Sequence, residues 1–280
     1  MKKFFKMAVA LSVMALAAGS ASAWNWPWAA KSENKISLTG STTVLPIAQK
    51  AAEEFMKINK GVEVSVKGGG SGVGIAAIID GSADIGNASR AIKAKEIINA
   101  KSKGINPVGN EVAKDGIAMV VHKSNPIDAI TLDQLRDIFS GRITNWSKIG
   151  GGSGKIVAVS RDTTSGTYEV FGELVLRGAK LRDDAIMTVS NREVAENVKN
   201  TEGAIGYLGL AFLSDEMKVL KVEGVMATEA NVINGTYKVA RPLYMYTNGE
   251  PSGLVKQFID YVVSSEGQKI VKEVGYVPVK

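Results

Sequence analysis

Hydrophobic and polar positions change between two periods along this chain. Short runs at 35–39 and 62–66 alternate as strands do, and apolar residues at helical spacing follow them at 44–58 and 73–79. The same order returns later, where a strand pattern at 156–159 precedes another helical run. Strands that alternate with helices predict an α/β fold with mainly parallel sheets.

The remaining pattern completes this prediction. Thr131 and Gln134 have the spacing of a capping box at a helix start. Asn234 and Gly235 favour a β-hairpin turn between short runs on either side. We expect further strands at 83–86, 116–122 and 241–247, and a strand with a turn at 203–213. We expect a helix from the Thr131 box that ends at Gly141, and further helices at 93–103, 191–199, 253–263 and 268–274.

The order of these elements suggests two lobes. The strands at 116–122 and 241–247 bracket the middle of the chain, which favours a second lobe inserted into the first and joined to it by two crossing segments. We therefore expect lobe 1 to comprise 35–116 and 238–280, and lobe 2 to comprise 117–237.

The first 23 residues have the composition of a secretory signal peptide. Three lysines precede an apolar run at 7–18, and small residues at 21–23 form a cleavage site. The apolar run is too short to span a bilayer, which disfavours the alternative of a membrane anchor. We expect cleavage after Ala23, a periplasmic location, no direct membrane insertion and a flexible tail at 24–34.

Composition narrows the possible functions. The formal net charge of +6 falls to +3 without the three lysines of the leader, and no basic cluster suggests a nucleic-acid partner. The chain has no cysteine for a disulfide or a lipid anchor, and its single histidine, His122, lies in an apolar strand pattern. We found neither a nucleophile elbow nor a phosphate-binding P-loop, so we expect no metal, no cofactor and no enzyme activity.

Three of the predicted strand-to-helix turns carry small hydroxylated residues, at 41–43, 71–72 and 165–167. The first amides of a helix lack partners and carry partial positive charge, so such turns attract anions. Ligands of α/β sheets bind at the carboxyl ends of strands, and Arg161 adds a charged fork there. We therefore expect a seat for a tetrahedral oxyanion between the lobes; the alternative is three ordinary helix caps and a surface arginine.

Several longer motifs occur in a specific order and cover nearly the whole chain after the leader. Together they resemble the periplasmic phosphate-binding proteins of bacterial phosphate ABC transporters. The motifs are GSTTVLPIA at 40–48, GGGSGVGI at 68–75, ADIGNASR at 83–90, LRDIFSGRITNWSKIGG at 135–151, SRDTTSGTYEVF at 160–171, GAIGYLGL at 203–210 and SSEGQKIVKEVGYVPV at 264–279.

The resemblance implies a type II periplasmic binding protein fold. Two lobes joined by two hinge strands would close on inorganic phosphate, and a monomer would deliver it to the transmembrane subunits of an ABC permease. The resemblance also implies the ligand contacts. These contacts are Thr42 and Thr43, with Ser41 close by, and Ser71, Ser89, Arg161, Ser165, Gly166 and Thr167. Arg90 is a further candidate for the ligand site.

Arg90 is a departure from the family pattern, because many relatives place an aspartate there that accepts the proton of hydrogen phosphate. An arginine at the anion favours any oxyanion, so a receptor for sulfate, molybdate or arsenate is an alternative; Arg90 could also face solvent. Asp162 could accept the proton or orient Arg161. From other classes, an extracellular phosphohydrolase or a phosphate sensor without transport would use the same seat.

Overall fold

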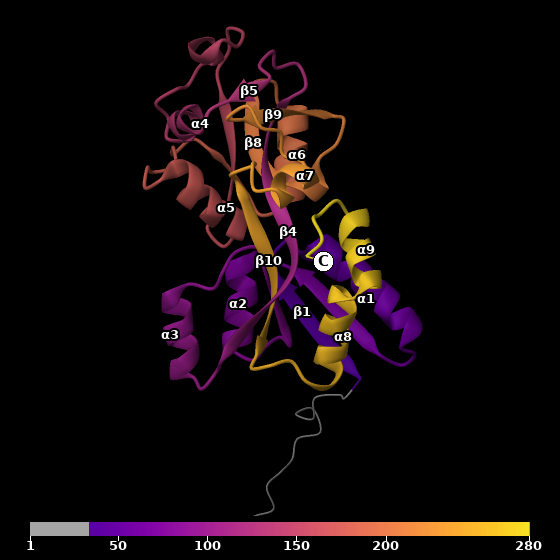
Figure 1. Cartoon of the computed structure of the whole chain (residues 1–280). Coiled ribbons are helices and arrows are strands. Elements are labelled where there is room, and N and C mark those ends of the chain that lie inside the picture. The colour runs from indigo at the N-terminus through magenta and orange to yellow at the C-terminus, as the bar shows by residue number, and fades with distance from the viewer. Residues whose placement is uncertain (1–33, 280) are drawn as a thin grey trace, which may run out of the picture. The chain divides into compact units, whose positions relative to one another are not determined.

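The computed structural model describes residues 34–279, so the predicted signal peptide and all of the predicted tail except Asn34 lie outside the described residues (Figure 1). The strands are β1 (Lys35–Gly40), β2 (Glu63–Gly68), β3 (Ile85–Ala88), β4 (Pro107–His122), β5 (Ala129–Ile130), β6 (Val157–Arg161), β7 (Ile186–Thr188), β8 (Ala204–Gly209), β9 (Met217–Val222) and β10 (Ala240–Asn248).

The helices other than α7 lie where the hydrophobic pattern predicts them. They are α1 (Leu45–Ile58), α2 (Ser71–Ile79), α3 (Ala94–Ser102), α4 (Leu132–Phe139), α5 (Gly166–Phe171), α6 (Asn191–Asn200), α7 (Glu229–Ile233), α8 (Gly253–Val263) and α9 (Ser265–Glu273). Two short 3-10 helices, η1 (Trp146–Ile149) and η3 (Leu210–Phe212), and a π-helical turn, η2 (Gly172–Leu176), complete the described secondary structure.

The strands form one mixed sheet in the order β2-β1-β3-β10-β4-β8-β6-β7, with β5 and β9 beside it. Pairing is parallel between β1 and both β2 and β3, between β6 and both β7 and β8, and between β5 and β9. Every antiparallel pair includes β4 or β10. The strands other than β4 and β10 thus pair only in parallel with one another, and the sheet is mixed because β4 and β10 pair antiparallel with their neighbours.

Strands β4 and β10 run side by side between two groups of elements (Figure 1). The first part of β4 pairs with β10, and its second part, from Ile117, pairs with β8. We call the elements β1–α3 with most of β10, α8 and α9 lobe 1, and the elements β5–α7 lobe 2. Two crossing strands therefore join the lobes, as the fold prediction requires.

Each lobe has its own hydrophobic core. In lobe 1 the apolar stripe of α1 packs with α8 against the sheet, and Phe55 meets Phe258 edge to face at 5.3 Å. A smaller cluster covers the other face beneath α2, whose residues are apolar nearly all round. In lobe 2 the cluster includes Phe171 and Tyr207, whose rings stack 3.9 Å apart. These cores hold the strand ends of each lobe in fixed positions.

The sheet register places the ends of the parallel strands next to one another. In lobe 1, Gly40 at the end of β1 is paired with Gly68 of β2 and with Asn87 of β3. In lobe 2, Arg161 at the end of β6 is paired with Thr188 of β7. The hydroxylated turns begin at these carboxyl ends.

Two predictions about the elements need correction. The predicted hairpin at Asn234 is wrong, because Asn234 is the C-cap of α7 and Gly235 takes the left-handed conformation that follows a helix, with φ of 71°. The strand predicted from residue 116 begins at Pro107, because pairing with β10 stabilises its polar first part. The capping box at Thr131 is confirmed, with the Thr131 hydroxyl accepting from the Gln134 amide.

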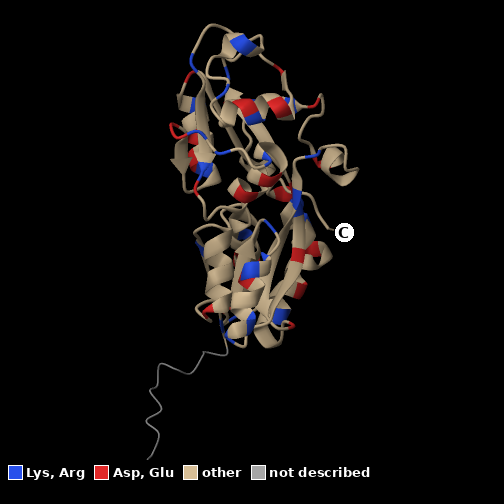
Figure 2. Ribbon diagram, turned by 90° about the vertical axis from the view of Figure 1, so that its left-hand side faces the viewer, with Lys and Arg blue, Asp and Glu red and all other residues tan. Residues whose placement is uncertain are grey.

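Among residues 34–279 no helix is long and apolar enough to cross a membrane. Basic and acidic residues are interspersed over both lobes in Figure 2.

The close packing of α2 on the sheet yields a stability prediction. A Cβ at Gly74 would lie 2.5 Å from the Asn87 carbonyl oxygen and 2.9 Å from that of Thr39. Because backbone atoms cannot yield easily, we expect Gly74→Ala to lower the free energy of unfolding by about 1–3 kcal/mol in urea titrations. The control is Gly172→Ala, another helical glycine with open space around it, which should be neutral or slightly stabilising. Equal midpoints for the two variants would contradict the packing.

Candidate functional site

The turns at the helix starts of the two lobes lie against one another. The hydroxyl oxygens of Thr43, before α1 in lobe 1, and Thr167, in the first turn of α5 in lobe 2, are 3.2 Å apart. Ser71, the first residue of α2, lies with its hydroxyl oxygen 3.2 Å from that of Ser89, which follows β3. Each of these four side chains is at most 1% exposed. The structure thus gathers small hydroxylated side chains from three helix starts and the end of β3.

Two of the candidate serines accept hydrogen bonds from amides that follow them, Ser41 in the turn before α1 and Ser165 as the N-cap of α5. The Ser41 Oγ accepts hydrogen bonds from the amides two and three residues further on, at 3.1 and 3.3 Å. The Ser165 Oγ does the same at the start of α5, also at 3.1 and 3.3 Å. Their lone pairs are therefore engaged, and each hydroxyl retains its proton as a donor.

Two glycines allow the lobes to approach closely. A Cβ at Gly166 would lie 2.3 Å from the Ser71 Oγ and 2.7 Å from the Ser89 Oγ. Gly70, with φ of 93°, lies so close to lobe 2 that a Cβ there would be 2.5 Å from the Thr164 hydroxyl oxygen. Both positions require the absence of a side chain, because any larger residue would hold the lobes apart.

Arg161 is the only arginine of this cluster without a carboxylate partner among the described residues. Its guanidinium, 1% exposed, donates to the carbonyl oxygens of Thr188 and Val189 and, at 3.2 Å from Nη2, to the Thr42 hydroxyl. Its Nη1 is buried and has no hydrogen-bond partner among the described residues. Burial lowers the pKa of Arg161 to about 10, which reflects the cost of an uncompensated charge.

Arg90, unlike Arg161, has carboxylate partners. Its Nη1 and Nη2 donate to the two carboxylate oxygens of Glu96 at 2.9 and 2.8 Å, and its Nε lies 2.6 Å from Glu169 in lobe 2. Lys93 lies 2.6 Å from the same Glu169 oxygen. Burial lowers the pKa of Arg90, but the two carboxylates outweigh burial and raise it. The alternative of a solvent-facing Arg90 is wrong, since the residue is 5% exposed.

Asp162 is directed to its own turn. One of its carboxylate oxygens accepts from the amide of Thr164, at 2.8 Å, and from the Thr164 hydroxyl. Within the described part of the chain it forms no hydrogen bond or ion pair with Arg161, although its negative charge favours the charged form of that arginine. Its main structural role is therefore to shape the loop before α5.

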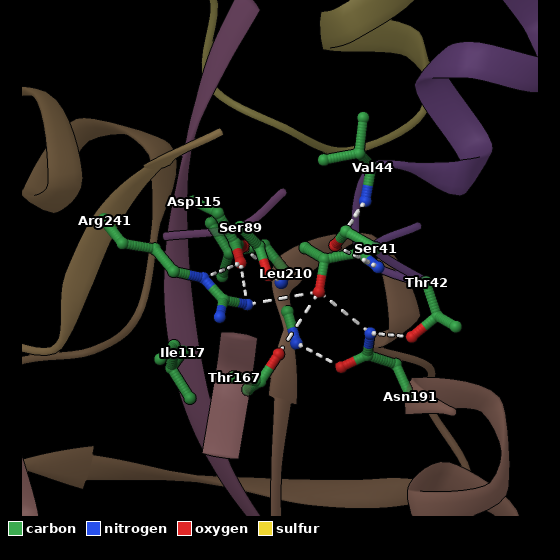
Figure 3. Close-up of polar contacts among 12 residues, drawn as sticks. Ser41, Thr42, Val44, Ser89, Asp115, Ile117, Thr167, Asn191, Leu210 and Arg241 are labelled. Carbon is green, nitrogen blue, oxygen red and sulfur yellow. Dashed lines mark hydrogen bonds and ion pairs between the residues drawn. The ribbon is translucent and has the colours of Figure 1, made fainter. Parts of the chain in front are cut away.

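The sequence prediction missed a buried ion pair behind the threonines. Asp115 of β4 and Arg241 of β10 are 0% and 4% exposed, with the Asp115 Oδ2 2.9 Å from the Arg241 Nη2. The other Asp115 oxygen accepts from the Leu210 amide at 3.0 Å, and Arg241 also donates to the Thr43 hydroxyl at 3.2 Å (Figure 3). Burial raises the pKa of Asp115, and Arg241 opposes that rise. The sequence shows Asp115 and Arg241 next to apolar strand patterns, but it does not show that the two residues pair with each other.

The sequence prediction also missed Asn191, the first residue of α6. Its side chain is 0% exposed, and its Nδ2 donates to the hydroxyls of Thr42 and Thr43 at 3.3 and 3.0 Å (Figure 3). Its Oδ1 accepts from the Gly209 amide at 3.3 Å. An asparagine after a capping serine gives no sign in the sequence that it contacts the other lobe.

No group of three or more histidine, cysteine, aspartate or glutamate side chains is placed to hold a metal ion within residues 34–279. His122 at the end of β4 pairs its Nδ1 with the Ser124 hydroxyl at 2.8 Å. The cluster itself offers hydroxyls and a guanidinium, which are hydrogen-bond donors that suit an anion.

Sequence comparisons relate this chain to known proteins. A PBP superfamily domain matches residues 27–266. The phosphate-binding protein PstS of Bacillus subtilis (strain 168) is 36% identical over 251 residues, which cover 89% of this chain and 82% of that protein. The protein SphX of Synechococcus elongatus is 34% identical over 260 residues, covering 87% and 77% of the two chains.

The chain belongs to the family of PstS-type phosphate-binding proteins.

Solved structures of this family share its fold. A Clostridium perfringens protein described as a phosphate ABC transporter substrate-binding protein, with bound phosphate, has a TM-score of 0.82 and 38% identity over 88% of this chain and 100% of that one. A Vibrio cholerae ABC-type phosphate transport receptor has a TM-score of 0.72 and 29% identity over 86% and 99%. The expected fold is confirmed, and the PstS-type family consists of binding proteins rather than enzymes.

The hydrogen bonds of the Tyr207 hydroxyl at the end of β6 yield a stability prediction. The buried Tyr207 hydroxyl lies 2.7 Å from the Ser160 Oγ and accepts from the Arg161 amide at 3.3 Å, and burial raises the pKa of Tyr207 to about 12. We expect Tyr207→Phe to lower the free energy of unfolding by about 1–2 kcal/mol, because two buried polar groups lose a partner.

The matched control is Tyr276→Phe, since the Tyr276 hydroxyl is buried without a hydrogen-bond partner among the described residues. This variant should be neutral or stabilising in the same urea titrations. A loss in Tyr276→Phe as large as that in Tyr207→Phe would contradict the role given to the Tyr207 hydroxyl.

Proposed function

We propose that this chain binds inorganic phosphate between its two lobes and delivers it to the permease of an ABC importer. The observation that carries the proposal is Arg161, a guanidinium that is buried at the contact of the lobes, lacks a carboxylate partner and has an unpartnered Nη1. A buried charge of this kind is unfavourable unless a counterion joins it. A phosphate dianion supplies that charge and accepts several hydrogen bonds.

The surrounding donors are sufficient for tight binding. The hydroxyls of Thr42, Thr43 and Thr167 lie within one hydrogen-bonded cluster that includes Arg161. Hydrogen bonds to a charged group contribute about 1.5–3 kcal/mol each. Micromolar affinity requires about 8 kcal/mol in total, so a small number of such bonds suffices. In this proposal the ligand set comprises the candidate residues of the sequence analysis except Arg90.

Closure of the lobes is the proposed mechanism. Donors from both lobes contact one anion, so phosphate stabilises the closed arrangement more than an open one. We place the hinge in β4 and β10, with the lobe boundaries at 116/117 and 237/238. The cross-lobe ion pairs of Glu169 with Arg90 and Lys93 add to the closed state. Arg90 thus acts on closure, rather than on the anion itself.

The biological setting is part of the same proposal. The relatives include proteins described as components of phosphate ABC transport, and the leader pattern at 1–23 is typical of export. We propose a periplasmic monomer whose closed form is recognised by the transmembrane subunits of the permease. Co-purification with these subunits would separate transport from phosphate sensing alone.

Titration calorimetry tests the proposal. We expect phosphate to bind the wild-type chain with micromolar or tighter affinity, and Arg161→Met to bind at least about 100-fold more weakly, because the charged donor is lost. The control for net charge is Arg142→Met, whose exposed side chain pairs with Asp137 and forms none of the described hydrogen bonds of the cluster, so the affinity should remain unchanged.

Titrations with sulfate, molybdate and arsenate in the same buffer decide which oxyanion is preferred. No heat with phosphate, together with strong binding of another of these anions, would overturn phosphate as the ligand. Turnover of a chromogenic phosphoester above the buffer rate would instead favour the hydrolase alternative.

A second prediction concerns closure. Glu169 is the carboxylate that lobe 2 offers to both Arg90 and Lys93, each at 2.6 Å, and its side chain is 11% exposed. We expect Glu169→Gln to weaken phosphate binding by about tenfold, because the closed state loses a partly buried charge pair. Glu266→Gln, which alters an exposed pair with Lys269, is the control and should have no effect. Unchanged affinity in Glu169→Gln would show that the cross-lobe pairs do not assist closure.

A further inference from the structure

The hydroxyl protons of the cluster have defined directions, and this follows from counting donors and acceptors. A hydroxyl has one proton to donate and two lone pairs that accept. The Thr43 Oγ1 lies 3.2 Å from the Arg241 Nη2 and 3.0 Å from the Asn191 Nδ2. A guanidinium can only donate, so both neighbours occupy the lone pairs of Thr43. The single Thr43 proton is left to point towards Thr167, 3.2 Å away.

The same count applies to Thr42. Its Oγ1 accepts from the Arg161 Nη2 at 3.2 Å and from the Asn191 Nδ2 at 3.3 Å. Both lone pairs are then occupied, and its proton is free for another acceptor. Thr167, which receives the proton of Thr43, likewise keeps its own proton to donate.

The orientation of the Asn191 amide is itself fixed. Its Oδ1 lies 3.3 Å from the backbone amide of Gly209, which can only donate, so the Nδ2 must face the threonines (Figure 3). Asn191 is 0% exposed, and water cannot substitute for these contacts easily. Arg241 is held in turn by Asp115, through distances of 3.2 Å from Nε and 2.9 Å from Nη2 to the Asp115 Oδ2.

We propose that Asn191 is a positioning residue which, together with Arg241 and Arg161, fixes the hydroxyls of Thr42 and Thr43 as hydrogen-bond donors. The inference rests on the proposed function and deepens it. The oxygens of a fully deprotonated tetrahedral anion can only accept hydrogen bonds. A site whose hydroxyls cannot turn their lone pairs towards the anion therefore suits such a ligand. Thr42 therefore donates its proton to the anion, and Thr43 donates to Thr167, whose own proton remains for the anion. Neither Thr42 nor Thr43 accepts the proton of hydrogen phosphate.

The test reverses the direction of the hydrogen bonds between residue 191 and the two threonines without changing the shape of the side chain. In Asn191→Asp a carboxylate replaces the amide, so Thr42 and Thr43 turn their protons to it and present lone pairs to the anion. We expect calorimetry to show phosphate binding at least about 100-fold weaker than in the wild type, but only about tenfold weaker in Asn191→Ala, where the hydroxyls can still rotate. Sulfate, which carries no proton at neutral pH, should lose more affinity than phosphate in Asn191→Asp, and the residual phosphate binding should strengthen as pH falls.

A double-mutant cycle separates this effect from simple charge repulsion. In the Thr43→Val background the further loss caused by Asn191→Asp should shrink by about tenfold, because one of the hydroxyls it acts through is gone. An equal loss in both backgrounds would show direct repulsion and overturn the inference. If circular dichroism shows that Asn191→Asp does not fold, the same cycle is measured with Asn191→Ala. The loss of phosphate affinity caused by Asn191→Ala must then also be smaller in the Thr43→Val background than in the wild type. Failure of the wild-type chain to bind phosphate would overturn the proposed function, whereas normal wild-type binding with equal affinities in Asn191→Asp and Asn191→Ala would overturn this inference alone.

Discussion

The site depends on the way buried positive charge is compensated. Three arginines lie within the contact between the lobes, and two of them have carboxylate partners: Arg241 pairs with Asp115, and Arg90 pairs with Glu96 and Glu169. Arg161 has only neutral partners among the described residues. Because removing a charge from water costs several kcal/mol, the uncompensated guanidinium is the feature on which we base the proposed anion site.

The fold supplies this arrangement through its topology. Parallel strands in each lobe end at the same edge, and the two crossing strands β4 and β10 bring these edges together. Glycines at 70 and 166 then remove the bulk that would keep the helix starts apart. The crossing strands also carry Asp115 and Arg241, so the segments that we propose as the hinge are bonded directly to the Thr43 turn. In the proposed mechanism, movement of the hinge therefore acts directly on the Thr43 turn.

Much of this architecture was predictable from the sequence, because period and turn chemistry are local signals. The strands and helices around 35–58 and 62–79, the capping box at Thr131 and the hydroxylated turns all follow from short patterns. The hairpin predicted at Asn234 was wrong, since the same two residues end a helix equally well. The partners of Arg90 and the cross-lobe contacts of Asn191 could not be predicted, because they join residues brought together only by the sheet order. Family resemblance added the identity of the anion, which local patterns leave open.

A crystal structure of the chain grown with phosphate tests the central claim most directly. The account predicts a phosphate oxygen within about 3 Å of the Arg161 Nη1, with further oxygens at the hydroxyls of Thr42, Thr43 and Thr167. Phosphate bound elsewhere, or an Arg161 whose Nη1 remains without an anion while the lobes are closed, would contradict it.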